Sequence, residues 1–112
     1  MITIADNKLH ISVTAMGNTA TIYLRGNFSF NAHRDFKVAY KDHLEDSNIG
    51  NIVVDLSGVK YLDSSALGML LVLRDRVLAA SKSLILSRPS PIAAKTFDIA
   101  GFHRMFTISD AA

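Results

Sequence analysis

The chain has 112 residues, of which 49% are hydrophobic and 20% are charged. This length suits a single domain, residues 1–112, with no room for a second independent core. The net charge of +2 is too small to indicate binding to nucleic acid or to an anionic membrane. Because the sequence contains no cysteine, disulfides, thiolate nucleophiles and cysteine zinc sites are excluded for this chain.

Membrane-spanning and targeting segments are not expected either. No apolar stretch reaches the length of about 20 residues that a membrane-spanning helix needs. Residues 1–10 contain Asp6 and Lys8 and have neither a basic start nor an apolar centre, so the sequence predicts no signal peptide. We therefore expect a cytoplasmic protein.

The first predicted elements are two strands joined as a hairpin. Apolar and polar residues alternate over residues 9–15 and again over residues 20–24, which is the pattern of half-buried strands. Between them, Gly17 and Asn18 suit a type II′ turn, because the first position of that turn needs a positive φ. We expect the second strand to end at Gly26.

A helix of three to four turns is predicted next, with Asn31 as its N-cap. Its apolar face consists of residues spaced three and four apart: Phe36, Ala39, Tyr40, His43 and Leu44. The following β-branched run, residues 52–54, indicates a central strand with a parallel neighbour, and we expect Ser57 and Gly58 to end it.

A second helix is predicted after a short loop, with Asp63, Ser64 and Ser65 as candidate caps. On a helical wheel the apolar residues fill one broad arc that should face the core: Ala66, Leu67, Met69, Leu70, Leu71, Leu73, Val77 and Leu78. The opposite strip carries mainly small residues, namely Ser64, Gly68, Val72, Asp75 and Ala79. This strip is a candidate docking face for another protein, and simple solvent exposure is the alternative interpretation.

The last predicted elements are a buried strand, a helix and an edge strand. Residues 84–86 form the strand, and the helix runs from Ser90, as N-cap before a proline, to Gly101, with Ile92, Thr96 and Phe97 on one side. Residues 105–108, with Met105, Phe106 and Ile108, are expected to add the edge strand. This element order predicts an α/β protein with a mixed sheet and right-handed crossovers.

Signatures of catalysis are absent from the sequence. It contains no G-x-S-x-G, Walker A, G-x-G-x-x-G or H-E-x-x-H motif, and the four histidines, His10, His33, His43 and His103, lack metal-ligand spacing. Asp55 and Asp63 could form an acid/base pair, but a strand end and a helix cap are the favoured interpretations of these two positions. We expect no metal, no cofactor and no enzymatic activity.

Residues 55–68, with the sequence DLSGVKYLDSSALG, carry the most specific pattern in the chain. This segment resembles the signature of the STAS domain, a module of anti-sigma factor antagonists and of the cytoplasmic ends of sulfate transporters. The resemblance implies the STAS fold, an α/β fold with a mixed four- to five-stranded sheet and about three to four helices packed mainly on one face. Two positions depart from the family pattern: Ser29 stands where many antagonists carry an acidic residue, and Ala66 where a glycine is common.

The same resemblance implies that Ser64 is phosphorylated by a partner kinase. In its unphosphorylated state the protein would bind an anti-sigma factor, which is usually the kinase itself, and so free a sigma factor; a metal-dependent serine phosphatase would restore that state. The partner-binding residues are predicted to be Asp63, Ser64, Ser65, Gly68 and Val72. Two alternatives stay open: an accessory subunit docked on the ATPase of an ABC transporter, and a module that binds a small ligand or a nucleotide.

Overall fold

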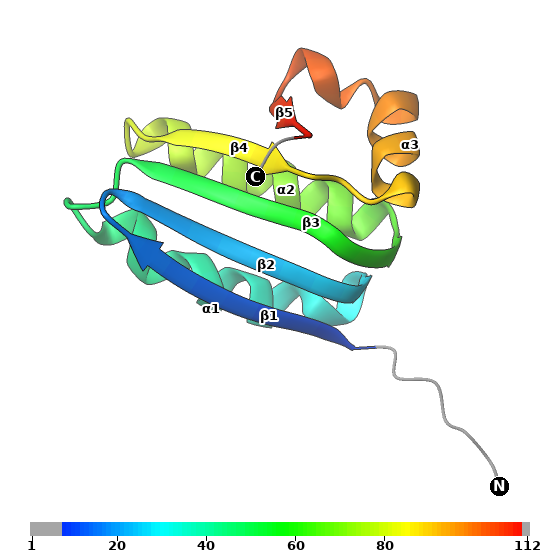
Figure 1. Cartoon of the computed structure of the whole chain (residues 1–112), viewed down its shortest axis with the longest axis horizontal. Coiled ribbons are helices and arrows are strands. Elements are labelled where there is room, and N and C mark those ends of the chain that lie inside the picture. Colours follow the sequence, from blue (N-terminus) through cyan, green and yellow to red (C-terminus); the bar gives the residue numbers. More distant parts are fainter. Residues whose placement is uncertain (1–7, 111–112) are drawn as a thin grey trace, which may run out of the picture.

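A computed structural model describes residues 8–110 of the chain, and its centre is a five-stranded sheet with the strand order β1-β2-β3-β4-β5 (Figure 1). Strand β1 pairs antiparallel with β2, and the other neighbours pair parallel, so the sheet is mixed as predicted. The strands are β1 (Leu9–Met16), β2 (Thr19–Phe28), β3 (Asn51–Leu62), β4 (Ser83–Ser87) and β5 (Thr107–Ser109). The signal-peptide prediction mostly concerns residues 1–7, which lie outside the described residues.

Three α-helices connect the parallel strands: α1 (His33–Glu45), α2 (Ser64–Ala79) and α3 (Pro91–Ala100). Helices α1 and α2 lie side by side on one face of the sheet, and α3, which follows the end of β4, packs against β3 (Figure 1). Two short 3₁₀ turns, η1 (Phe30–Ala32) and η2 (Phe102–Arg104), lead into α1 and follow α3. The predicted α/β architecture, with helices mainly on one face, is confirmed.

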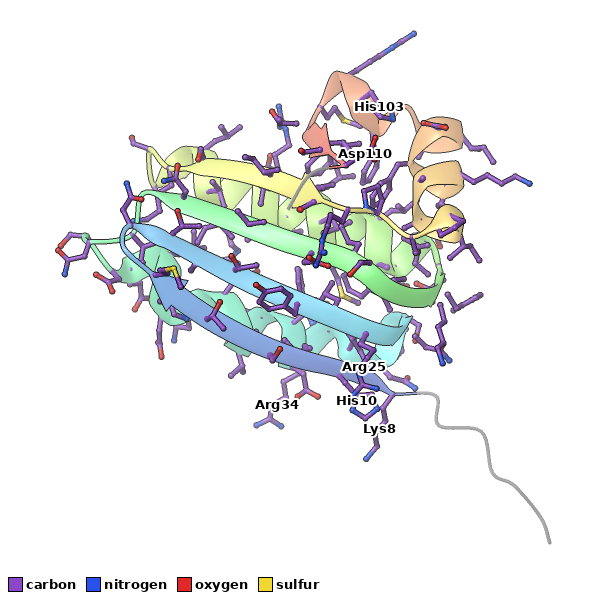
Figure 2. The ribbon with its side chains drawn as sticks, viewed as in Figure 1. Lys8, His10, Arg25, Arg34, His103 and Asp110 are labelled. Carbon is purple, nitrogen blue, oxygen red and sulfur yellow. The ribbon has the colours of Figure 1, made fainter. Side chains whose placement is uncertain are left out.

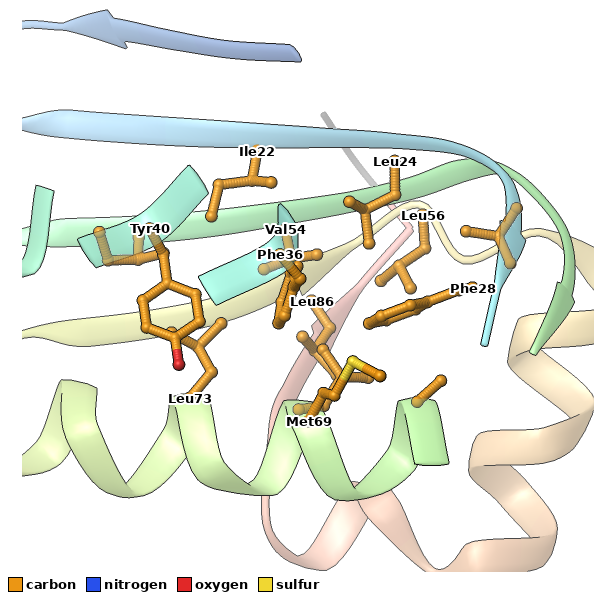
Figure 3. Close-up of a cluster of buried hydrophobic side chains, with 14 of the residues drawn as sticks. Ile22, Leu24, Phe28, Phe36, Tyr40, Val54, Leu56, Met69, Leu73 and Leu86 are labelled. Carbon is orange, nitrogen blue, oxygen red and sulfur yellow. The ribbon is translucent and has the colours of Figure 1, made fainter. Parts of the chain in front are cut away.

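The core lies between the sheet and the pair of helices. Figure 3 shows side chains of β2, β3 and β4 directed toward α1 and α2, where they are buried: Ile22, Leu24, Val54, Leu56 and Leu86 from the strands, and Phe36, Tyr40, Met69 and Leu73 from the helices. Aromatic rings continue this layer, with ring centroids 5.1 Å apart for Phe28 and Phe36 and 5.4 Å apart for Phe36 and Tyr40. This contact fixes α1 against the end of β2.

Two strands continue past the glycines at which we expected them to end. Strand β2 runs through Gly26 to Phe28, and β3 runs through Gly58 to Leu62. Gly26 has a φ of +105°, and a Cβ there would lie 2.6 Å from the carbonyl oxygen of Lys8. The β2–β3 register shifts in the same region, so these glycines form irregularities inside the strands and do not end them.

The hairpin prediction is confirmed, since β1 and β2 pair from Met16 and Thr19 outward. Gly17 has a φ of +61°, as the first position of the predicted turn requires. The predicted start of the first helix is wrong. Asn31 lies in η1, and α1 begins at His33 with Ala32 before it, which offers no side-chain cap.

The apolar faces of the later elements differ in part from the prediction. Leu78, which was expected to face the core, is 57% exposed: it lies in the last turn of α2, where it lines an open hollow with Leu84 of β4 and with Met105. In α3 the buried pair is Ala93 and Phe97, and Ile92 is exposed. Only part of the predicted last strand is a strand. Ile108 lies in β5, whereas Phe106 precedes β5 and packs into the core.

The ends of α3 form as predicted. Ser90 is the N-cap, Pro91 occupies the first turn, and Gly101 closes the helix with a φ of +71°. Within residues 8–110, none of the helices is both long enough and apolar enough to cross a membrane.

Candidate functional site

The candidate site is built where β3 passes into α2. Asp63 is the N-cap of α2: it is extended, and its Oδ1 accepts a hydrogen bond of 3.0 Å from the amide of Ala66. Its Oδ2 accepts a second bond, of 3.3 Å, from the amide of Phe30. The carboxylate therefore ties the start of α2 to η1, thirty-three residues earlier in the chain.

Ser64 is the first residue of α2, and its side chain is exposed. It does not cap the helix, as one interpretation of the sequence proposed, because Asp63 holds that position. Among residues 8–110, no acceptor bonds the amides of Ser64 and Ser65. Unpaired amides at the start of a helix carry partial positive charge, so the Ser64 hydroxyl lies in a setting that suits an anionic group.

The predicted strip on α2 is exposed along its length. We call it the docking strip; it consists of Ser64, Gly68, Val72, Asp75 and Ala79. A Cβ built on Gly68 would meet nothing within 4 Å, and Val72 is 47% exposed. The predicted partner-binding residues thus lie together: Asp63 and Ser65 are half-buried at the start of the helix, and the other three are on its outer surface.

One exposed residue beside this strip was not anticipated from the sequence. The side chain of Phe30 is 73% exposed, and with His33 and Lys37 it lines a hollow whose other wall includes Gly68 and Val72. A phenylalanine within the polar segment after β2 was the available signal, but the sequence does not reveal that the bond to Asp63 brings it to α2.

Asp55 serves a structural role at its strand position and does not pair with Asp63, which is the interpretation that the sequence favoured. Its Oδ1 accepts hydrogen bonds from the amide (2.9 Å) and the hydroxyl (2.7 Å) of Ser57. Its Oδ2 accepts bonds from Nε (2.9 Å) and Nη2 (2.6 Å) of Arg88. Burial raises the pKa of Asp55, but the bonds from Ser57 and the charge of Arg88 outweigh burial and hold the pKa below its ordinary value.

The histidines do not gather into a site. Figure 2 places His10 near the start of β1, beside Arg25, and His103 on the other side of the molecule. His103 Nε2 lies 2.8 Å from Asp98 Oδ1, an exposed pair at the end of α3. Within the part of the chain that the structure describes, no group of three or more histidine and carboxylate side chains could hold a metal ion.

Comparison with known proteins supports the family suggested by residues 55–68. The family model described as "Mlab, STAS domain" matches residues 11–108, which is nearly the whole chain. A STAS-domain containing protein of Pseudomonas aeruginosa is 42% identical over 96 residues, covering 86% of this chain and 93% of that protein. Both matches span the candidate site.

Solved structures agree on the fold. An anti-sigma factor antagonist from Mycobacterium paratuberculosis superposes with a TM-score of 0.83 at 17% identity, covering 96% of this chain and 90% of the other. The anti-sigma factor antagonist SpoIIAA is similar in its unphosphorylated form (TM-score 0.73, 20% identity, covering 90% and 87%). The phosphorylated form of Bacillus SpoIIAA is also similar (TM-score 0.68, 20% identity, 90% of each chain). These superpositions show a shared fold. At identities of 17–20% they carry no statement about the function of this chain.

Proposed function

We propose that this chain, which belongs to the STAS-domain family, is an anti-sigma factor antagonist that is switched off by phosphorylation of Ser64. In the unphosphorylated state it binds an anti-sigma factor, or a related regulator, and thereby frees a sigma factor. Phosphorylation ends that binding. The protein acts as one STAS domain over residues 1–112, as a regulator and not as an enzyme.

The observation that carries this proposal is the placement of Ser64. Its hydroxyl is exposed on the first residue of α2, next to amides that have no acceptor among residues 8–110. A phosphate adds a charge of about −1.5 to −2, which the start of a helix accommodates at little cost to the fold. The neighbouring Asp63 uses its carboxylate as a cap, so the helix start does not depend on the Ser64 hydroxyl.

Phosphorylation would instead act on the partner. A surface that accepts a neutral hydroxyl beside Asp63 would have to desolvate a doubly charged group next to a carboxylate of the same sign. The solved forms of SpoIIAA, with and without phosphate, support such a switch by analogy of fold. For this chain, the kinase is proposed to be the anti-sigma factor itself, using ATP, and a metal-dependent serine phosphatase reverses the step in the cytoplasm.

Affinity capture from the native cell tests the proposal. Wild-type protein should retain a serine kinase of the anti-sigma class, and Ser64→Asp should retain much less of it. With the captured partner purified, calorimetry should give at least a ten-fold lower affinity for Ser64→Asp, equivalent to about 1.4 kcal/mol. Ser12→Asp, which adds the same charge at an exposed position of β1, is the matched control and should bind like the wild type.

Two results would contradict the proposal. Equal affinity of Ser64→Asp and the wild type would remove Ser64 from the switch. Capture of a transporter ATPase by both proteins equally would favour the alternative of a constitutive accessory subunit.

A further inference from the structure

We propose that the groove between α1 and α2 binds an acidic amphipathic helix of the regulatory partner. This inference rests on the proposed function, because it names the part of the partner that the Ser64 switch would control. It does not follow from the docking strip alone, since it depends equally on α1 and on η1.

The groove consists of two hollows that adjoin along the same pair of helices. The first has a volume of about 340 Å³; Phe30 and Lys37 line one wall, and Gly68, Met69, Val72 and Arg76 of α2 line the other. The second, of about 450 Å³, shares Lys37, Tyr40 and Arg76 with the first and continues to Leu44, Glu45 and Ala80. Along α2 the groove extends from Ser65 to Ala79, a length of roughly 21 Å or about four turns of a helix.

The shape of the groove favours a helix over a small molecule. A small ligand is usually enclosed over most of its surface, whereas this groove is long and open, with the exposed Phe30 and Val72 on its rim. The lining combines apolar side chains, including Phe30, Met69 and Val72, with polar and charged ones. An amphipathic helix presents anchors at i, i+3, i+4 and i+7, which is the spacing that such a groove accepts.

The charge of the groove determines which sign of charge its partner must carry. Lys37, Lys41 and Arg76 line the two hollows, and the lining contains one carboxylate, Glu45, at the far end. None of the three cations forms an ion pair with a carboxylate of residues 8–110. Unpaired cations around an apolar floor favour a helix whose flanks carry Asp or Glu.

The position of Ser64 connects the groove to the switch. Ser65 and Gly68 line the groove, and Ser64 lies one residue before Ser65 on the same helix end. A phosphate at Ser64 therefore places about two negative charges at the entrance, where an acidic helix would pass. Repulsion would release the partner without any movement of α1 or α2.

Two synthetic peptides of opposite charge test the groove. Each has about eighteen residues and the same leucine stripe; one has Glu on its polar positions and the other has Lys. We expect the Glu peptide to bind with at least ten-fold higher affinity, more weakly as salt rises, and to shift the amide NMR signals of Lys37, Gly68 and Val72. Equal binding of both peptides, no binding of the Glu peptide, or shifts confined to another surface would overturn the proposal.

Charge-reversed variants separate the groove from the overall charge of the protein. Lys37→Glu with Arg76→Glu should weaken binding of the Glu peptide at least ten-fold. Lys95→Glu with Arg104→Glu makes the same change on exposed residues of α3 and η2, outside the groove, and should leave the affinity within two-fold. If both double variants lowered the affinity for the Glu peptide equally, the attraction would be non-specific and the groove would not be the binding site.

The same peptide distinguishes failure of this inference from failure of the proposed function. Ser64→Asp should lower the affinity for the Glu peptide several-fold, and Ser12→Asp should leave that affinity unchanged. If the Glu peptide did not bind while Ser64→Asp still released the native partner, the groove would be wrong and the proposed function would stand. If the peptide bound in the groove but Ser64 had no effect on the native partner, the proposed function would fail and the groove would remain.

Discussion

At the scale of single residues, Gly68 offers the sharpest test of the docking strip. A side chain at this position meets nothing within 4 Å, so Gly68→Glu should keep a near-native melting temperature. The same variant places a bulky charge one turn from Ser64 and should lower the affinity for the native partner at least ten-fold, as phosphorylation would. Calorimetry of binding and thermal unfolding measure the two effects.

Gly68→Ala is the matched control for that prediction. Removing a glycine from an exposed position inside a helix should stabilise the protein by about 0.5 to 1 kcal/mol, and the small methyl group should leave binding intact. A large fall in the melting temperature of Gly68→Glu would mean that this position packs against another part of the chain, and the strip would have been misassigned.

Asp63 is predicted to act mainly on stability. Its carboxylate caps α2 and also holds the amide of Phe30, so Asp63→Ala removes two hydrogen bonds. We expect a loss of about 1 to 2 kcal/mol in the free energy of unfolding, measured in urea. Asp63→Ser should recover most of it, because serine also caps helices; equal losses in the two variants would contradict the capping role.

At the scale of elements, the ion pair of Asp55 and Arg88 joins β3 to the segment between β4 and α3. Arg88 has a φ of +48°, and its amide bonds the carbonyl oxygen of Ser109 at 2.6 Å, so the pair and this bond hold it in the left-handed region. Arg88 is 42% exposed, which limits the energy of the pair.

The lowered pKa of Asp55 predicts how stability depends on pH. Because the folded carboxyl binds its proton less tightly than the unfolded one, its contribution to the free energy of unfolding is complete above the unfolded pKa, about 3.8. It is lost as pH falls through the folded pKa. We expect Asp55→Asn to lose about 2 kcal/mol at pH 7 and to depend less on pH below about 4 than the wild type does, as urea unfolding across pH would measure.

The same elements illustrate what the sequence could predict. The β-branched run at residues 52–54 and the alternation in β1 identified strands, because burial on one or both faces produces those patterns directly. The strand ends at Gly26 and Gly58 were mispredicted. There the absence of a side chain serves close contact between strands, with a Cβ at Gly58 only 3.1 Å from the Arg25 side chain, and local sequence does not reveal such contacts.

The candidate site was predictable in its local part only. Ser64, Gly68 and Val72 share one face of α2 through helical spacing alone, so their common exposure followed from the sequence. The sequence did not predict which of Asp63, Ser64 and Ser65 caps the helix, since all three are suitable residue types. The wall formed by Phe30 and Lys37 depends on packing between segments distant in the chain, and no periodicity encodes it.

At the scale of the whole molecule, the architecture allows a switch that leaves the fold unchanged. The core lies between the sheet and the inner faces of α1 and α2, whereas Ser64 and the rest of the docking strip are on the outer surface of α2. A charge added at Ser64 therefore changes what approaches the surface and not what packs beneath it.

Mass spectrometry of the protein, after incubation with ATP and an extract of its native cells, measures whether Ser64 is phosphorylated. We expect one added phosphate, located on Ser64 by fragmentation, and none on Ser64→Ala treated in the same way. Ser65→Ala is the matched control and should still be phosphorylated. Phosphate on Ser65, or no phosphate on the wild-type chain, would contradict the claim that Ser64 is the switch.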